Sequence, residues 1–290
     1  MMEHILVASD FSPRSDRALR RAVLVARQFS SKITLLHALD DELPEPLLAV
    51  HRDSCEGLLA EMAQTVATSD QITCAYRVIM GDPFRVLVDA TRDLEPDLVV
   101  MGPHRRNLLK DIFFGTTAER TIRESAAPVL MANGVPAGAY QRVLIAADLS
   151  ECSLEATRAA RTLGFLEGAH ITMLHVLDAP EHSMMQRSVM PADDIEDNFL
   201  SARAEANQSL QSFVSAVGVQ PDQKIVQPVK LSVSDTILEA ARKARADLLV
   251  IGTHGRTGIE KFFLGSMAEE VLRYAELDVL VIPSLTRGAG

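Results

Sequence analysis

The stretch "ADLLVIGTHGR", residues 246–256, has a near-copy 150 residues earlier, "PDLVVMGPHRR" at 96–106. In each copy a short apolar run ends in glycine and passes into a polar loop. A continuous apolar run of this length indicates a strand that is buried on both faces, as in a parallel sheet. Its repetition indicates that the same fold is built twice.

Further pairs extend this repeat over the whole chain. "ILVASDFSPRS" at 5–15 matches "VLIAADLSECS" at 143–153, and "ITLLHALDD" at 33–41 matches "ITMLHVLDA" at 171–179. These pairs lie 138 residues apart, whereas pairs later in each copy lie 150 apart, so the second copy carries a net insertion of twelve residues. We place the insertion in the polar, methionine-containing stretch 180–198, which suits a surface loop, a lid or a partner surface.

The chain of 290 residues is long enough for two ordinary domains. The join lies near "NGVPAGAYQ", residues 133–141, because its Gly and Pro residues are typical of a linker. We therefore expect domains at 1–137 and 138–290.

Apolar runs alternate with helical patterns in each half. Residues 13–29 and 151–166 predict helices, which begin at Ser12 with Pro13 and at Ser150 with Glu151. The expected strands lie near 4–9, 33–39, 73–80, 97–102 and 128–132, with counterparts near 142–147, 170–177, 224–231, 247–252 and 278–282. The pattern predicts an α/β protein of two tandem, doubly wound parallel-sheet domains. Ligands of such sheets lie at the carboxyl ends of the strands, where the strand order reverses.

The composition favours a soluble protein and argues against a membrane protein or a nucleic-acid-binding protein. With 47% hydrophobic and 23% charged residues, the chain is typical of a soluble protein with a substantial core. Its apolar runs are too short to span a membrane, and the strand-like start leaves no room for a signal peptide, so we expect a cytoplasmic protein. The formal net charge of −10 argues against nucleic-acid binding. Cys55, Cys74 and Cys152 form no CxxC pair, and we expect reduced, packed thiols.

Two pairs of polar residues lie at the ends of the first two strands of each half. Asp10 and Asp148 stand after the first strand of each half, where an Asp either shapes a turn or accepts a hydrogen bond from a ligand. The repeat leaves both roles open. His37 and His175 stand in the second strands, and we expect buried, hydrogen-bonded imidazoles with a structural role. No third group accompanies them at metal-ligand spacing, so we expect no zinc site.

The loop after the fourth strand of the second half has the spacing of glycines that is typical of a phosphate-binding site. Gly252 and Gly255 are followed, nine residues later, by Gly265 and Ser266. Glycine lets a backbone approach a phosphate closely, and the helix that opens at Ser266 presents N–H groups that favour an anion. The spacing predicts a polyphosphate held between loop and helix; a merely flexible turn is the alternative.

This spacing resembles the G-x2-G-x9-G-[ST] motif of the universal stress protein family in its tandem two-domain form, and the resemblance covers essentially the whole chain. It implies adenine nucleotide alpha hydrolase-like, Rossmann-like domains that bind ATP, usually with a divalent ion such as Mg²⁺ at the phosphates. It also implies pairing of the domains through their last strands, here inside one chain, and leaves a homodimer open. The positions that it carries over as nucleotide-binding residues are Asp148, Val176, Gly252, Gly255, Gly265 and Ser266.

The first half departs from the motif, because Arg105 stands at the place of its second glycine. We therefore expect the second half to bind nucleotide, and the first to be a scaffold or to hold something else. The weaker candidates in the first half are Asp10, Gly102, Gly115 and Thr116.

The resemblance implies a regulatory, nucleotide-binding module of the stress response, without catalytic residues. A slow ATPase is one alternative, although hydrolysis needs a metal and a positioned water, and Glu260 is the one carboxylate in 252–266. An adaptor without a ligand is another, and a small apolar or anionic ligand other than nucleotide is a third.

Overall fold

The structure is a computed structural model that describes residues 2–40, 45–103, 116–178, 192–253 and 264–283. The elements of its first half are β1 (His4–Ala8), α1 (Pro13–Phe29), β2 (Lys32–Leu39), α2 (Glu45–Ser69), β3 (Cys74–Met80), α3 (Pro83–Asp93), β4 (Leu98–Met101), α4 (Thr116–Glu124) and β5 (Val129–Met131). Those of its second half are β6 (Arg142–Ala146), α5 (Glu151–Thr162), β7 (His170–Leu177), α7 (Ala192–Val217), β8 (Gln223–Pro228), α8 (Val233–Ala244), β9 (Leu248–Gly252), α9 (Ser266–Tyr274) and β10 (Asp278–Ile282).

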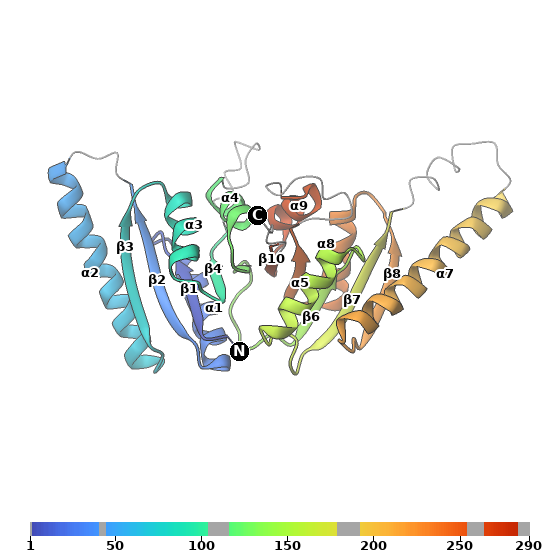
Figure 1. Cartoon of the computed structure of the whole chain (residues 1–290), viewed down its shortest axis with the longest axis horizontal. Coiled ribbons are helices and arrows are strands. Elements are labelled where there is room, and N and C mark those ends of the chain that lie inside the picture. Colours follow the sequence, from blue (N-terminus) through green and yellow to red (C-terminus); the bar gives the residue numbers. More distant parts are fainter. Residues whose placement is uncertain (1, 41–44, 104–115, 179–191, 254–263, 284–290) are drawn as a thin grey trace, which may run out of the picture.

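The strands of both halves form one 10-stranded sheet, in the order β3-β2-β1-β4-β5-β10-β9-β6-β7-β8 (Figure 1). All neighbouring strands are parallel except β5 and β10, which are antiparallel. In that pair Val279 lies opposite Met131, Leu280 opposite Leu130 and Val281 opposite Val129. The predicted α/β class with two tandem parallel sheets is confirmed, and the two sheets are continuous with each other.

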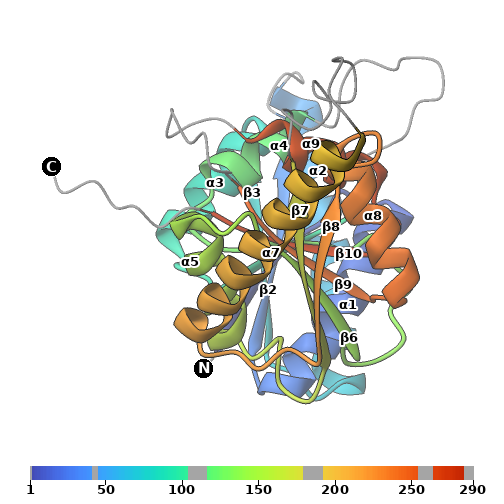
Figure 2. The same cartoon turned by 90° about the vertical axis from the view of Figure 1, so that its right-hand side faces the viewer.

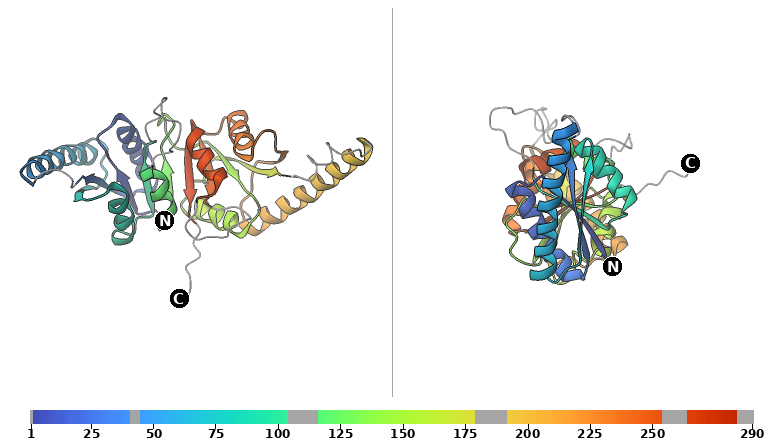
Figure 3. Two further views of the ribbon diagram at one scale, coloured as in Figure 1. Left: turned by 90° about the horizontal axis from the view of Figure 1, so that it is seen from above. Right: turned by 90° about the vertical axis from the view of Figure 1, so that its left-hand side faces the viewer.

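Helices cover both faces of the sheet, and each face has its own core (Figure 2). Because side chains alternate along a strand, Ile5 and Val7 enter one core while Leu6 enters the other. The first core includes residues of α1, α2, α5 and α7, and the second includes residues of α3, α4, α8 and α9. Each core thus contains residues of both halves. Helices α2 and α7 lie at the two far ends of the molecule (Figure 3).

Helix α1 has the predicted bounds, and its start follows from its cap. The Ser12 hydroxyl accepts hydrogen bonds from the backbone N–H groups of Arg14 and Ser15, and Pro13 occupies the first helical position. Ser150 caps α5 in the same way. The predicted end of α5 at 166 is wrong.

Helix α5 ends at Thr162 because Gly164 adopts a left-handed conformation, with φ of +86°. A Cβ atom at Gly164 would lie 2.5 Å from Cε1 of Phe29, which belongs to the first half. This glycine therefore ends the helix where a side chain of the other half approaches.

Two further expectations differ from the structure. The strand expected over 224–231 ends at Pro228. Residues 192–198, which we assigned to the polar insertion, form the start of α7; its acidic first turn favours a helix N-terminus. The rest of the insertion, 179–191, lies outside the described residues.

The cysteines are free thiols, as expected. Cys55 is buried, and Cys74 and Cys152 are half-buried. Burial raises the pKa of Cys55, and it raises that of Cys74 to about 11. Among the helices that the structure describes, none is both long and apolar enough to span a membrane.

A carboxylate fixes the start of the central strand in each half. Asp97 accepts hydrogen bonds from the backbone N–H groups of Glu3 and His4, at 2.7 and 2.9 Å. Asp247 does the same for the start of β6. These contacts join the segment before β4 or β9 to the neighbouring strand, and hydrogen bonds to a charged group are the stronger kind.

Replacing Asp97 by alanine should lower the free energy of unfolding by about 1.5–3 kcal/mol, because two backbone donors lose a charged acceptor. Asp93→Ala, at an exposed residue nearby, is the matched control and should change it by less than about 0.5 kcal/mol. Urea unfolding of both variants measures the difference. Equal effects would show that the Asp97 contacts contribute nothing.

Candidate functional site

The described candidate residues of the second half gather at one edge of the sheet. Asp148 follows β6, Val176 lies near the end of β7, and Gly252 ends β9. Because β6 lies between β7 and β9, these three positions meet where the strand order reverses. Gly255 lies outside the described residues.

The two oxygens of Asp148 have different surroundings. Oδ1 accepts hydrogen bonds from the N–H and hydroxyl of Ser150, at 3.0 and 2.6 Å, and from the hydroxyl of Ser153 at 2.6 Å. Oδ2 is buried and has no hydrogen-bond partner within the described part of the chain. A buried carboxylate oxygen without a donor is costly. Oδ1 therefore shapes the turn, whereas Oδ2 is left without a donor among the described residues.

Asp10 has a different environment, because it is exposed to solvent. Its Oδ1 accepts a hydrogen bond from the Ser12 N–H at 3.0 Å. Partial desolvation acts to raise the pKa of Asp10, but hydrogen bonds from Ser12 and Ser15 outweigh it, and the pKa lies below its usual value. The first-half carboxylate is thus solvated, whereas its counterpart has a buried oxygen.

The residue after each aspartate is strained. Phe11 and Leu149 have φ of 57° and 66°, in the left-handed region that such side chains rarely adopt. Neither these strained residues nor the Ser153 contact was predicted from the sequence. The repeated pattern D-x-S-x-x-S, seen in "DFSPRS" and "DLSECS", was the signal that could have revealed the turn.

Both histidines are hydrogen-bonded as expected, but the expected burial holds for His175 and is incomplete for His37, which lines the first-half cavity. Nδ1 of His175 donates a hydrogen bond to the carbonyl of Ala147 at 2.8 Å, and Nδ1 of His37 donates to the carbonyl of Ser9 at the same distance. His175 is buried, and His37 is half-buried. Each imidazole fixes the backbone immediately before the aspartate.

The N-terminus of α9 borders the same edge. Gly265 is its N-cap residue and supplies no side-chain hydrogen bond, while its N–H donates to the carbonyl of Thr253 at 2.9 Å. This bond closes the base of the glycine loop. The φ of Gly265 is −61°, which any residue can adopt. Glycine instead allows the backbone to lie close to Thr253, because a Cβ would lie 3.3 Å from the Thr253 carbonyl oxygen. Ser266, at the first helical position, is exposed.

The first half has a cavity of about 540 Å³ at the equivalent edge. Volumes of roughly 300–1,000 Å³ are typical of small-molecule sites. Its walls come from the ends of β1, β2 and β4 and from the starts of α1, α3 and α4, and include Asp10, Arg14, His37, Gly102 and Thr117.

Gly102 is required by packing in this half. A Cβ atom there would lie 2.6 Å from the carbonyl oxygen of Arg14, at the start of α1. Thr116 begins α4, and Gly115 lies outside the described residues. Gly102 therefore has a structural reason that does not involve a ligand. Within the described residues, no group of three or more His, Cys, Asp or Glu is placed to hold a metal ion.

Comparison with known proteins gives the family. The model of the universal stress protein family matches the chain twice, at residues 1–133 and 139–283. The chain belongs to the universal stress protein family. Universal stress protein E of Salmonella typhi is 23% identical over 299 residues, which cover 97% of this chain and 94% of that protein. A universal stress protein of Mycolicibacterium smegmatis is 25% identical, with 96% of each chain covered.

Solved structures of universal stress proteins have the same fold. One from Archaeoglobus fulgidus superposes with a TM-score of 0.73 at 18% identity, covering 97% of this chain and 98% of that one. A putative one from Pseudomonas aeruginosa gives 0.69 at 19% identity, covering 98% and 94%. The tandem arrangement is therefore shared with other universal stress proteins.

Gly102→Ala should lower the free energy of unfolding of this universal stress protein by about 1–3 kcal/mol, because the new methyl group meets backbone rather than a flexible side chain. Gly57→Ala, in α2 with no atom within 4 Å of the new Cβ, should instead raise it by about 0.4–1 kcal/mol. Denaturant titration of the two variants measures the sign of each change in the free energy of unfolding. A neutral Gly102→Ala would mean that α1 shifts away freely.

Proposed function

We propose that this universal stress protein is a regulatory module that binds an adenine nucleotide, ATP with a divalent ion such as Mg²⁺, mainly in its second half. The observation that carries the proposal is the buried Oδ2 of Asp148, which lies where the strand order reverses and lacks a donor among the residues that the structure describes. A hydroxyl or amine of an adenosine moiety supplies such a donor. The family to which the chain belongs supports the same assignment.

The surrounding residues fit the other parts of a nucleotide. Val176 is half-buried beside the second core and offers an apolar contact to the base. The uncapped start of α9, at Gly265 and Ser266, offers backbone N–H groups and the positive end of a helix dipole to phosphates. When bound, the divalent ion would supply positive charge at the phosphates, and these residues would hold and orient the nucleotide.

We propose a lesser role for the first half, with the domains divided at 137 and 138. Asp10 is solvated, Gly102 is explained by packing, and Arg105 replaces a motif glycine. The pairing of β5 with β10 lets the first half act as the scaffold that a second protomer would otherwise provide. Its cavity leaves room for a separate small ligand.

Isothermal titration of ATP with Mg²⁺ should show one site per chain, and Asp148→Asn should weaken binding by about 10- to 150-fold. Asparagine keeps one oxygen for Ser150 but replaces the second acceptor, so a charged hydrogen bond worth about 1.5–3 kcal/mol is lost. Asp10→Asn is the matched control and should leave the affinity within about twofold. Equal losses in both variants would contradict the assignment to the second half.

Gly255→Arg copies the first-half loop into the second half and should abolish binding at that site. The large charged side chain would occupy space that the proposed phosphate contacts require, and it would remove the close backbone approach that glycine allows. Titration of this variant beside Arg105→Gly, the reverse change, compares the two loops. If the unmodified protein itself does not bind ATP, the adaptor function takes precedence.

A further inference from the structure

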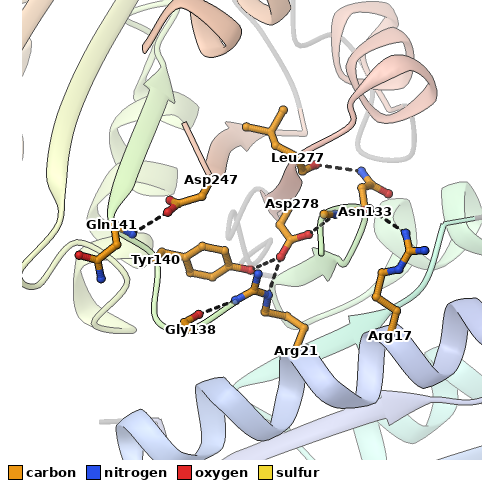
Figure 4. Close-up of polar contacts among 10 residues, drawn as sticks. Arg17, Arg21, Asn133, Gly138, Tyr140, Gln141, Asp247, Leu277 and Asp278 are labelled. Atoms are coloured by element: carbon orange, nitrogen blue, oxygen red, sulfur yellow. Dashed lines mark hydrogen bonds and ion pairs between the residues drawn. The ribbon is translucent and has the colours of Figure 1, made fainter. Parts of the chain in front are cut away.

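A buried polar cluster joins the two halves at the junction of β5 and β10 (Figure 4). Asp278, at the start of β10, is fully buried, and its Oδ2 lies 2.6 Å from Nε of Arg21, whose side chain is 5% exposed. The Tyr140 hydroxyl donates to the same oxygen at 2.6 Å, and the Gly134 N–H donates to Oδ1 at 2.7 Å. Both oxygens of a buried carboxylate are thus engaged.

The arginine has further contacts, although its Nε forms an ion pair with Asp278 and not a well-aligned hydrogen bond. Its NH1 donates to the carbonyl of Gly138 at 2.7 Å, and its guanidinium lies 4.4 Å from the centre of the Tyr140 ring. Burial, together with the Asp278 carboxylate, raises the pKa of Tyr140 well above its usual value, so the hydroxyl keeps its proton. Through Arg21, helix α1 of the first half therefore contacts both the connecting segment and β10 of the second half.

The rest of the junction obeys a twofold symmetry. Residues 129–131 and 279–281 are equivalent in the repeat, and the pair of Leu130 with Leu280 lies on the symmetry axis. All six residues of these two segments are buried and apolar. Such strands pair equally well with their own kind, so the apolar contacts do not distinguish like from unlike domains.

The polar cluster breaks this symmetry. The repeat places Ala159 at the position of Arg21, and Pro128 at the position of Asp278. Met2 stands where Tyr140 would be. Arg21, Asp278 and Tyr140 thus lie on one side of the symmetry axis. Their equivalents on the other side carry no charge.

Pairing of like domains would leave these charges buried alone. Two first halves joined through β5 would bury Arg21 opposite Pro128, and two second halves joined through β10 would bury Asp278 opposite Ala159. A buried charge without its partner is strongly unfavourable. We propose that the Arg21–Asp278–Tyr140 cluster is a recognition element that selects pairing of unlike domains. The surface around β5 thus fits the second half of this chain and rejects the first half of another copy.

Cleavage of the connecting segment in the folded protein tests this proposal. A protease site inserted between Pro136 and Ala137, next to Val135 at 80% exposed, allows cleavage after folding. Native mass spectrometry should find the two halves as a 1:1 unlike pair, without like pairs. Arg21→Met should raise the dissociation constant of the pair by about 100-fold or more. Arg20→Met, at a side chain 72% exposed on the same helix, is the control and should leave it unchanged.

The double variant Arg21→Met with Asp278→Asn removes both charges and keeps an acceptor for Gly134. Like pairs should then appear beside the unlike pair, because no charge is left unpaired in either. Like pairs in the cleaved unmodified protein, or equal dissociation of the Arg21→Met and Arg20→Met proteins, would overturn the proposal. If Arg21→Met does not fold, the double variant decides, and a lack of like pairs in it also overturns the proposal.

Discussion

Three residue pairs, centred on Leu130 and Leu280, join two parallel sheets into one continuous sheet. Both strands are completely buried, so separating the halves at this edge would expose unpaired backbone N–H and C=O groups together with apolar side chains. The pairing also fixes how α4 and α9, which follow the two glycine loops, are placed on one face of the sheet. The position of each candidate site relative to the other depends on this short antiparallel contact.

Much of the fold could be predicted because the signals are local and occur twice. Apolar runs gave the strands, and Ser12 with Pro13 gave the start of α1. The end of α5 was not predicted in this way. The close approach of Phe29, which leaves no room for a side chain at Gly164, involves a residue far away in the sequence. The same holds for Asp278, whose buried charge is explained by a helix of the other half.

The candidate site was predictable in outline and not in its reasons. The glycine spacing predicts a site at the edge of the sheet where Asp148, Val176 and Gly252 lie, but Gly102 is explained by the carbonyl of Arg14, and Gly265 by close approach to Thr253. Glycine in such a motif is therefore not, by itself, a mark of ligand binding. The described parts of the two halves differ in the carboxylates, since Oδ2 of Asp148 is buried without a donor there and Asp10 is solvated. The sequence places an aspartate at both positions, and the hydrogen-bond partners of its oxygens depend on the folded turn.

Each of the two cores contains side chains from both halves, one on each face of the sheet. Neither half can then lose its packing without uncovering apolar surface that belongs to the other. The stabilities of the two halves are therefore coupled through shared packing, although the sequence is written as two. Free energy gained by any ligand that binds the native state of one half would, through this packing, also stabilise the other half, including the distant helix α2.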